Sequence, residues 1–279
     1  MTKISAAEVN KLRKMTGSGM MDCKNALVEA EGDFDKAIDI LRKKGQKVAA
    51  KRGDREAAEG VVLADVTADK KTGVLIALNC ETDFVAKNEE FFNVAKNILN
   101  AALENKPATI EELKALKYPG SDLTIAEKIT EEIGKIGEKI DISAYEIINA
   151  DTVVAYNHPG NKLATIVGFN KEGDKIEEVG KQVAMQVAAM NPIAVSEEGV
   201  PADIIEKEMA IGREQAIQEG KPENIVDKIA EGKVKKYLKE NTLLNQAFIR
   251  DNKLTVEQFL SQSENGLTVT EFKRVMIGG

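Results

Sequence analysis

The sequence LIALNCETDFVAKN, residues 75–88, is expected to lead from a buried strand into a helix. Leu75–Leu78 is an uninterrupted apolar run, which is typical of a strand buried on both faces, because a half-buried strand alternates. Asn88 is a good helix N-cap, and apolar residues recur behind it at helical spacing. Residues 79–87 are not expected to continue the strand. They should form a connection, a place where binding groups are often presented.

The segment that precedes this connection is repeated later in the chain. VVLADVTADKKTGVLIALN, residues 61–79, aligns with VVAYNHPGNKLATIVGFN, residues 153–170, when one turn residue is removed. Apolar positions coincide in the two copies, and both copies end in Asn. We therefore predict an internal repeat of a β-hairpin followed by a helix. The two units are expected to pack side by side as layers of sheet and helix.

The amino-terminal residues 1–46 are predicted to form three short helices with caps and apolar stripes. Gly45 is expected to end the third helix as its C-cap. Helices of this size can bury only a small core, which indicates a compact separate module. The polar, alanine-rich residues 47–59 are interpreted as a linker with room for some helix.

A projecting antiparallel helical hairpin is predicted from two charge-rich helices, Asp203–Gln218 and Glu223–Glu240, joined at Gly-Lys-Pro, residues 220–222. A short helix, Val256–Leu260, and a final strand, Leu267–Val275, are expected after it. The apolar seam of the hairpin is expected to place Ile204, Ile205, Met209, Ala216 and Ile217 against Ile225, Ile229, Val234 and Leu238.

These patterns indicate an α+β protein made of several parts. A further helix is expected over Ile125–Ile140. We predict a helical bundle at 1–46, a linker at 47–59, a first core subdomain at 60–140, a second core subdomain at 141–191 and 241–265, the helical hairpin at 192–240, and a short carboxy-terminal strand and tail at 266–279.

The composition is that of a soluble globular protein, with 43% hydrophobic and 30% charged residues among 279. No apolar run is long enough to span a bilayer, and the start of the chain lacks the apolar core of a signal peptide, so we expect no membrane partner and a cytoplasmic protein. The net charge is −7, and the one basic run, residues 42–55, is interpreted as a solvated segment. Aromatics are 4% and Trp is absent, so direct nucleic-acid binding is not expected.

No residue constellation indicates an enzyme active site. His158 is the one histidine, and it lies in a predicted hairpin turn without a predictable nucleophile or orienting acid. Residues 16–19, TGSG, lack the Gly-Lys-Ser/Thr ending of a P-loop and follow no strand. Cys80 and Cys23 form no C-x-x-C pair, and the carboxylates near Cys80 have no second ligand cluster, so neither a metal site nor a cofactor is predicted.

Phe84 has two open interpretations. It could plug the core under the following helix, which for a lone loop Phe is about as common as exposure. Its neighbours Thr82, Asp83 and Lys87 are polar, however, and an acidic residue beside an aromatic ring on a rigid turn suits a wedge. In that case the ring enters a partner's pocket while the carboxylate competes for polar groups.

Two long segments of the sequence resemble a known family. LRKMTGSGMMDCKNALVEAEGDFDKAIDILRKKG, residues 12–45, and NCETDFVAKNEEF, residues 79–91, closely resemble the amino-terminal module and the core motif of the elongation factor Ts family. The similarity continues through AAEG at 57–60, Tyr156–His158 and GKPENIVDKIAEGKVKKYLKE at 220–240, so it covers nearly the whole chain.

The resemblance implies a guanine-nucleotide exchange factor for elongation factor Tu, which displaces Mg²⁺ and promotes GDP release in translation. It implies a UBA-like, that is ubiquitin-associated-like, three-helix bundle whose Met20 and Met21 contact the partner's GTPase domain. Thr82, Asp83, Phe84 and Val85 would intrude beside the nucleotide site. His158 would face the partner's third domain.

The family's hairpin is a protruding coiled coil, which allows a homodimer or heterotetramer. Many members continue into a further carboxy-terminal helix, whereas this sequence ends at Met276–Gly279, so contacts of that helix are not carried over. Such a factor needs no catalytic group, only differential affinity for two states of its partner. The alternatives are a UBA-like adaptor or a ribosome-associated binding protein without exchange activity, or an enzyme with an unrecognised site.

Overall fold

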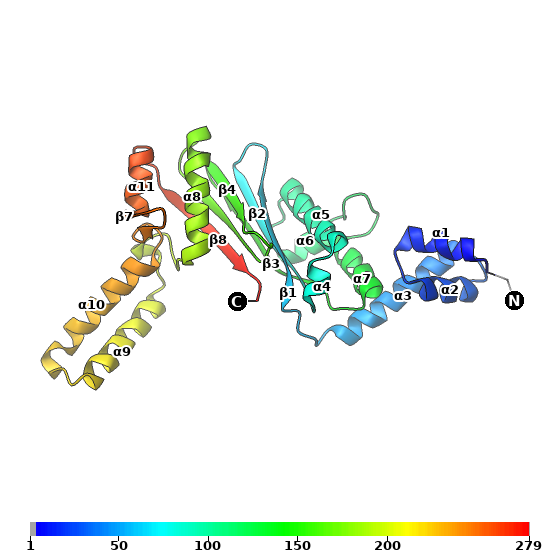
Figure 1. The fold of residues 1–279 in the computed structure, drawn as a ribbon, viewed down its shortest axis with the longest axis horizontal. Helices are drawn as coiled ribbons and strands as arrows, with labels where there is room; N and C mark the ends of the chain where they lie inside the picture. The colour runs from blue at the N-terminus through cyan, green and yellow to red at the C-terminus, as the bar shows by residue number, and fades with distance from the viewer. Residues whose placement is uncertain (1–3, 279) are drawn as a thin grey trace.

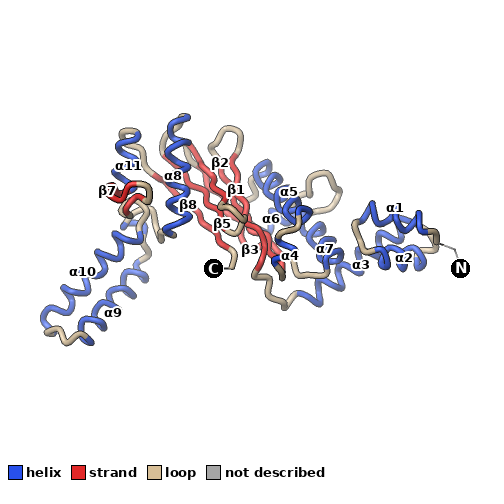
Figure 2. Tube along the Cα trace, in the orientation of Figure 1, coloured by secondary structure: helices blue, strands red, loops and turns tan. Residues whose placement is uncertain are grey.

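The computed structural model describes residues 4–278, so residues 1–3 of the predicted bundle and Gly279 of the predicted tail lie outside the described residues. The described chain is elongated, with the amino-terminal helices at one end, a core that contains the sheets, and a helical hairpin at the other end (Figure 1). Helices and strands follow one another in groups along the chain and occupy separate layers in space (Figure 2), which confirms the mixed α+β class.

The residue ranges of the helices and strands are as follows. The helical elements are α1 Ala6–Thr16, α2 Met20–Glu29, α3 Phe34–Arg52, α4 Asp83–Ala86, α5 Glu89–Asn105, α6 Ile110–Ala115, α7 Ile125–Ile136, α8 Asp174–Met190, the 3-10 turn η1 Glu197–Gly199, α9 Ala202–Gln218, α10 Glu223–Asn241 and α11 Val256–Ser263. The strands are β1 Glu59–Val66, β2 Thr72–Cys80, β3 Asp141–Asn149, β4 Thr152–Asn157, β5 Leu163–Phe169, β6 Ala247–Phe248, β7 Asp251–Thr255 and β8 Val269–Met276.

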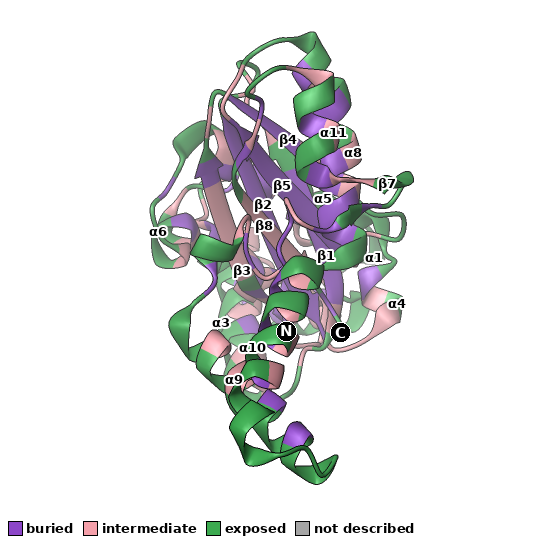
Figure 3. Ribbon diagram, turned by 90° about the vertical axis from the view of Figure 1, so that its left-hand side faces the viewer, coloured by how far each residue is buried: buried purple, intermediate pink, exposed green. Residues whose placement is uncertain are grey.

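Two antiparallel three-stranded sheets, with the orders β1-β2-β3 and β4-β5-β8, form the centre of the core. Side chains on β1 and β2 alternate between two apolar layers. Leu63 and Ile76 pack with α5 and α7, whereas Val62 and Leu75 pack against the second sheet. The outer face of that sheet, including Val167, is covered by α8 and α11. Buried strands therefore lie between outer helices, as Figure 3 shows.

The predicted repeat is present as β1-β2-α5 and β4-β5-α8. β2 is buried along its whole length, which confirms the two-sided burial predicted for Leu75–Leu78. The strand is longer than predicted, however, because Asn79 and Cys80 continue it. The polar Asn79 is tolerated there because its side chain donates to Ala57 O at 3.0 Å and accepts from the Ser143 hydroxyl at 2.5 Å.

The helix predicted over Ile125–Ile140 ends at Ile136, because Gly137 adopts the left-handed conformation with φ 82° and donates its N–H to the carbonyl of Ile133. The next strand, β3, was not predicted. It pairs with β2 in the first sheet, beyond the predicted boundary at residue 140. As an edge strand it is mostly half-buried, so its sequence has neither an apolar run nor a clean alternation.

Gly45 does not end the third helix, since α3 continues to Arg52 through the first part of the predicted linker. Gly45 instead lies against α7, where an added Cβ would meet Thr130 O at 3.1 Å and Gly134 Cα at 3.5 Å. The missing side chain thus permits close packing of two helices. Val48 and Ala49 continue this packing onto the first core cluster.

The helical hairpin is present, and its predicted seam is confirmed at Ala216, Val234 and Leu238, which are buried, but not at two isoleucines. Ile217 is 64% exposed and Ile225 is 36% exposed. The seam also contains small residues that were not predicted, since a Cβ on Gly212 would lie 3.1 Å from Ala230 Cα. Close approach at small residues turns the larger Ile side chains outward.

The final strand is part of the core. β8 pairs with β5 from Leu163↔Met276 to Phe169↔Val269, and Ile277 packs between the two sheets. The predicted carboxy-terminal strand therefore completes the second sheet and is not a loose tail.

Candidate functional site

The connection after β2 presents one aromatic ring to solvent. Thr82 precedes α4, a single helical turn that carries Asp83 and Phe84. Phe84 is 84% exposed, which rules out the core-plug interpretation. Ala86 is buried, and Val85 packs against the first core cluster, so the turn is seated on the core while the ring points away from it.

Asp83 forms an ion pair next to this ring. Lys87 Nζ donates to Asp83 Oδ2 at 2.6 Å, and the two residues are one helical turn apart. This hydrogen bond is the main reason why the pKa of the Asp83 carboxyl lies below its ordinary value. Asp83 is therefore ionised at neutral pH, and its side chain is 45% exposed, so the carboxylate is available at the surface beside Phe84.

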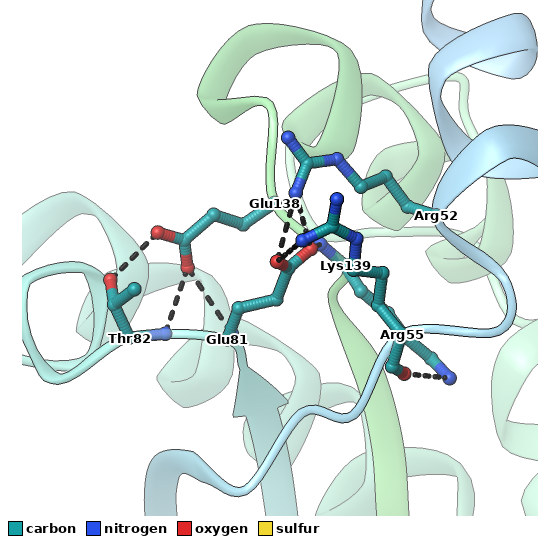
Figure 4. A network of polar contacts seen from close by, with 6 residues as sticks. All are labelled: Arg52, Arg55, Glu81, Thr82, Glu138 and Lys139. Atoms are coloured by element: carbon teal, nitrogen blue, oxygen red, sulfur yellow. Dashed lines mark hydrogen bonds and ion pairs between the residues drawn. The ribbon is translucent and has the colours of Figure 1, made fainter.

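A network of polar contacts surrounds the start of the turn (Figure 4). The carboxylate of Glu138, in the α7–β3 loop, accepts the N–H groups of Glu81 and Thr82 and the Thr82 hydroxyl. Glu81 in turn contacts residues of neighbouring segments. Arg52 Nη1 donates to its two carboxylate oxygens at 2.8 and 3.0 Å, Lys139 N donates to it at 2.7 Å, and Arg55 forms an ion pair with it at 3.9 Å. These contacts hold the pKa of Glu81 below its ordinary value, with the Lys139 N–H as the largest cause.

Cys80 is poorly suited to act as a nucleophile. Its side chain is buried, and this burial raises the pKa of the thiol to about 12. In the described part of the chain, no group of three or more His, Cys, Asp and Glu side chains could hold a metal ion. Within residues 4–278, no helix combines the length and the apolar character that a bilayer crossing requires.

Met20 and Met21 lie at the start of α2, within the amino-terminal bundle, and are 53% and 62% exposed. They do not share a site with Phe84. α3 connects the bundle to the beginning of β1, near α4, so the two sets of residues lie at separate places on one side of the core (Figure 1).

His158 lies in the turn between β4 and β5, and its Nδ1 is 2.9 Å from the Tyr156 hydroxyl. The turn is held against β1, because the Asn157 side chain bonds to both the N–H and the C=O of Ala64 at 2.8 Å. Val62 N also donates to Asn161 O at 2.7 Å. The structure thus places His158 on a hairpin end that is held against β1.

Sequence reasoning missed Glu138, Glu81 and Arg52. Glu138 contacts Thr82 across 56 residues of sequence, so no local pattern links them. Gly137 could have indicated the position of Glu138. A Gly that ends α7 places the charged residues after it in a loop, and this loop turns back toward β2.

The known proteins that are similar to this chain carry the same family name. A family model described as "Elongation factor TS" matches residues 81–279. A protein named Elongation factor Ts from Amoebophilus asiaticus is 55% identical, with 99% of both chains covered. Proteins of the same name from Christiangramia forsetii, 53% identical with 100% of both chains covered, and Porphyromonas gingivalis, 54% identical with 97% of both covered, are similar to it as well.

Proposed function

Because the chain belongs to the elongation factor Ts family and thus serves as nucleotide exchange factor for elongation factor Tu in translation elongation, we propose that its turn Thr82–Val85 displaces Mg²⁺ and drives GDP release. Exchange is not a chemical reaction, so the factor acts through binding alone. The observation that carries the proposal is the 84% exposure of Phe84 on a turn whose neighbours Val85 and Ala86 are seated in the core.

The thermodynamics require only differential affinity. Mg²⁺ bridges nucleotide phosphates and protein oxygens, and its charge supplies much of the nucleotide affinity. A factor that binds the GTPase more tightly without Mg²⁺ and GDP weakens nucleotide binding by the same factor. Phe84 supplies an apolar anchor for such a state. The Asp83 carboxylate competes for the polar groups of the partner that surround the metal.

The remaining exposed residues suit docking. Met20 and Met21 offer an apolar patch on α2, and His158 offers a polar contact on the β4–β5 turn. We assign them to partner binding rather than to metal displacement. α1–α3 share one small apolar core and are proposed to form a UBA-like bundle, and α9–α10 are proposed to form a protruding coiled coil. A homodimer or heterotetramer through that coiled coil is part of the same proposal.

We propose two changes to the domain boundaries. Because β3 pairs with β2, the first core subdomain extends to residue 149. Because β8 pairs with β5, the second includes residues 266–278.

The test is stopped-flow release of a fluorescent GDP analogue from elongation factor Tu. Phe84→Ala should slow release by roughly tenfold or more, as expected for loss of an interface anchor. The same change should shift the free energy of unfolding by less than about 0.5 kcal/mol, whereas truncation of a buried Phe costs about 3–5 kcal/mol. Ile249→Ala, at another exposed apolar residue, is the control and should leave release unchanged. Normal release with Phe84→Ala would refute the proposal.

The role of Asp83 is separable by metal removal. Asp83→Asn should slow release when Mg²⁺ is present, and the defect should shrink when Mg²⁺ is chelated, because the step that the carboxylate assists has then already occurred. A defect of equal size with and without Mg²⁺ would assign Asp83 to general docking.

A further inference from the structure

Glu138 holds the start of the exposed turn from outside it. Its Oε2 accepts the backbone N–H groups of Glu81 at 3.2 Å and Thr82 at 3.0 Å, and its Oε1 accepts the Thr82 hydroxyl at 2.7 Å (Figure 4). An ionised carboxylate only accepts hydrogen bonds, so it suits three donors that converge from one side. Bonds to a charged acceptor are also stronger than neutral ones.

The turn needs such an anchor because few interactions within the turn fix its position. α4 is only four residues long, and the Thr82 side chain makes no capping bond to it. The hydroxyl that would serve as a cap is turned toward Glu138 instead. Phe84 is 84% exposed, so packing does not set the direction of its ring. That direction follows from the backbone at Thr82 on one side and from the buried Ala86 on the other.

The anchor is itself tied to two other segments. Gly137 ends α7 and begins the loop that carries Glu138 and Lys139. Lys139 donates its N–H to Glu81 at 2.7 Å and its Nζ to the carbonyls of Gly53 and Arg55 at 2.7 and 2.9 Å. The end of α3, the end of β2 and the α7–β3 loop therefore meet at one junction beneath the turn.

We propose that Glu138 is a positioning residue for nucleotide exchange, which holds the backbone at Thr82 so that Phe84 projects in the direction its partner requires. The residue acts through Thr82 and touches neither nucleotide nor metal. This inference rests on the proposed function of Phe84, and its first test is independent of that function.

The first test measures the turn in the free protein. The chain contains no Trp, so Phe84→Trp introduces a single indole at the tip. Glu138→Ala in this background should lower the fluorescence anisotropy of the indole, because the turn loses its anchor. Glu127→Ala is the matched control: Glu127 accepts the N–H and hydroxyl of Thr124 at 2.7 and 3.0 Å, but at the opposite end of α7. It should leave the anisotropy unchanged. Equal anisotropy in the Glu138→Ala and Glu127→Ala variants would overturn the inference.

The second test measures GDP release from elongation factor Tu against concentration of this protein. Glu138→Ala should lower the maximal rate roughly tenfold while the half-saturating concentration changes little, since docking contacts lie elsewhere. Glu138→Gln keeps one acceptor oxygen for the two N–H groups and can donate to the Thr82 hydroxyl, so it should stay within about threefold of the unaltered protein. Thr82→Val removes only the hydroxyl bond and should give an intermediate rate even if Glu138→Ala does not fold.

A double-mutant cycle separates positioning from general stability. In the Phe84→Ala background, Glu138→Ala should cause no further loss of maximal rate, because there is no ring left to position. Additive losses, together with an equal fall of Tm in both backgrounds, would make Glu138 a structural residue only. Normal release with Phe84→Ala would refute the proposed function, whereas slow release with Phe84→Ala but normal release with Glu138→Ala would refute this inference alone.

Discussion

Gly45 of α3 and Gly134 of α7 meet with no side chain between the two helix backbones. A Cβ added to Gly134 would lie 2.6 Å from Gly45 Cα, which is closer than van der Waals contact allows. α3 begins in the amino-terminal bundle and ends at Arg52, beside Glu81. This glycine contact thus sets how the bundle sits relative to the core and to the exposed turn.

Gly134→Ala should therefore push α3 away from α7. We expect a loss of about 1–3 kcal/mol in the free energy of unfolding, typical of an overpacked contact. Urea unfolding measures it. Gly232→Ala is the control, because Gly232 lies inside α10 with no atom near its missing Cβ. That change should be neutral or stabilise by up to about 1 kcal/mol. The same effect at both positions would show that the glycines are not in tight contact.

Met20 and Met21 should contribute to affinity rather than to the exchange step. Replacing both by Ser should raise the half-saturating concentration for GDP release and leave the maximal rate unchanged, because both side chains are exposed on α2 of the amino-terminal bundle, whereas Phe84 lies on α4. Thermal melting should show no loss of stability. Met190→Ser, at an exposed methionine at the end of α8, is the control. A lower maximal rate with unchanged half-saturation would contradict this assignment.

Glu81 should make the junction sensitive to acid. Contacts with the Lys139 N–H and Arg52 lower its folded-state pKa below the ordinary value of 4.5. The group therefore contributes stability that is fully present above about pH 4.5 and is lost as the pH falls through the folded-state pKa. The difference in unfolding free energy between Glu81→Gln and the unaltered protein should be constant near pH 7 and shrink at acid pH. A pH-independent difference would contradict this.

The repeated units could be predicted because their strands are buried on two faces and therefore contain long apolar runs. β3 could not, since an edge strand with residues such as Tyr145 and Glu146 half-buried has no clear period. Gly45 illustrates a second limit. A Gly in a helical pattern can mark the end of a helix or a close contact with another helix. Only the packing of α7 against α3 in the folded protein distinguishes the two.

The site shows the same division. The position of Phe84 on a connection after a buried strand followed from the apolar run and the Asn88 cap. The exposure of Phe84 could not be predicted, because a lone Phe on a connection can be buried in the core or exposed at the surface. Glu138 was beyond local reasoning, since its role depends on a loop that returns to β2 from 56 residues away.

The helical hairpin should be divisible into a structural base and a dispensable tip. Its base packs in a small cluster with the loop that precedes α9, made of Ala194, Val200, Val234 and Leu238, and Leu243 N donates to Ala194 O at 2.9 Å. Beyond this cluster the helices contact only each other, and most of the tip is exposed (Figure 3). Removing residues 211–231 with a short Gly-Ser link should thus preserve stability and GDP release. Removing residues 203–239, which takes Val234 and Leu238 away, should lower Tm.

The shorter excision also tests self-association. Ile211, Ile217 and Ile225 are exposed on the part removed, and such side chains can stabilise a contact between two hairpins. If the protein dimerises through its hairpin, sedimentation should show a dimer for the unaltered chain and a monomer for the shortened one at the same concentration. A dimer that survives the excision would place self-association on another surface. Equal losses of stability from both excisions would show that the tip, too, is part of the core.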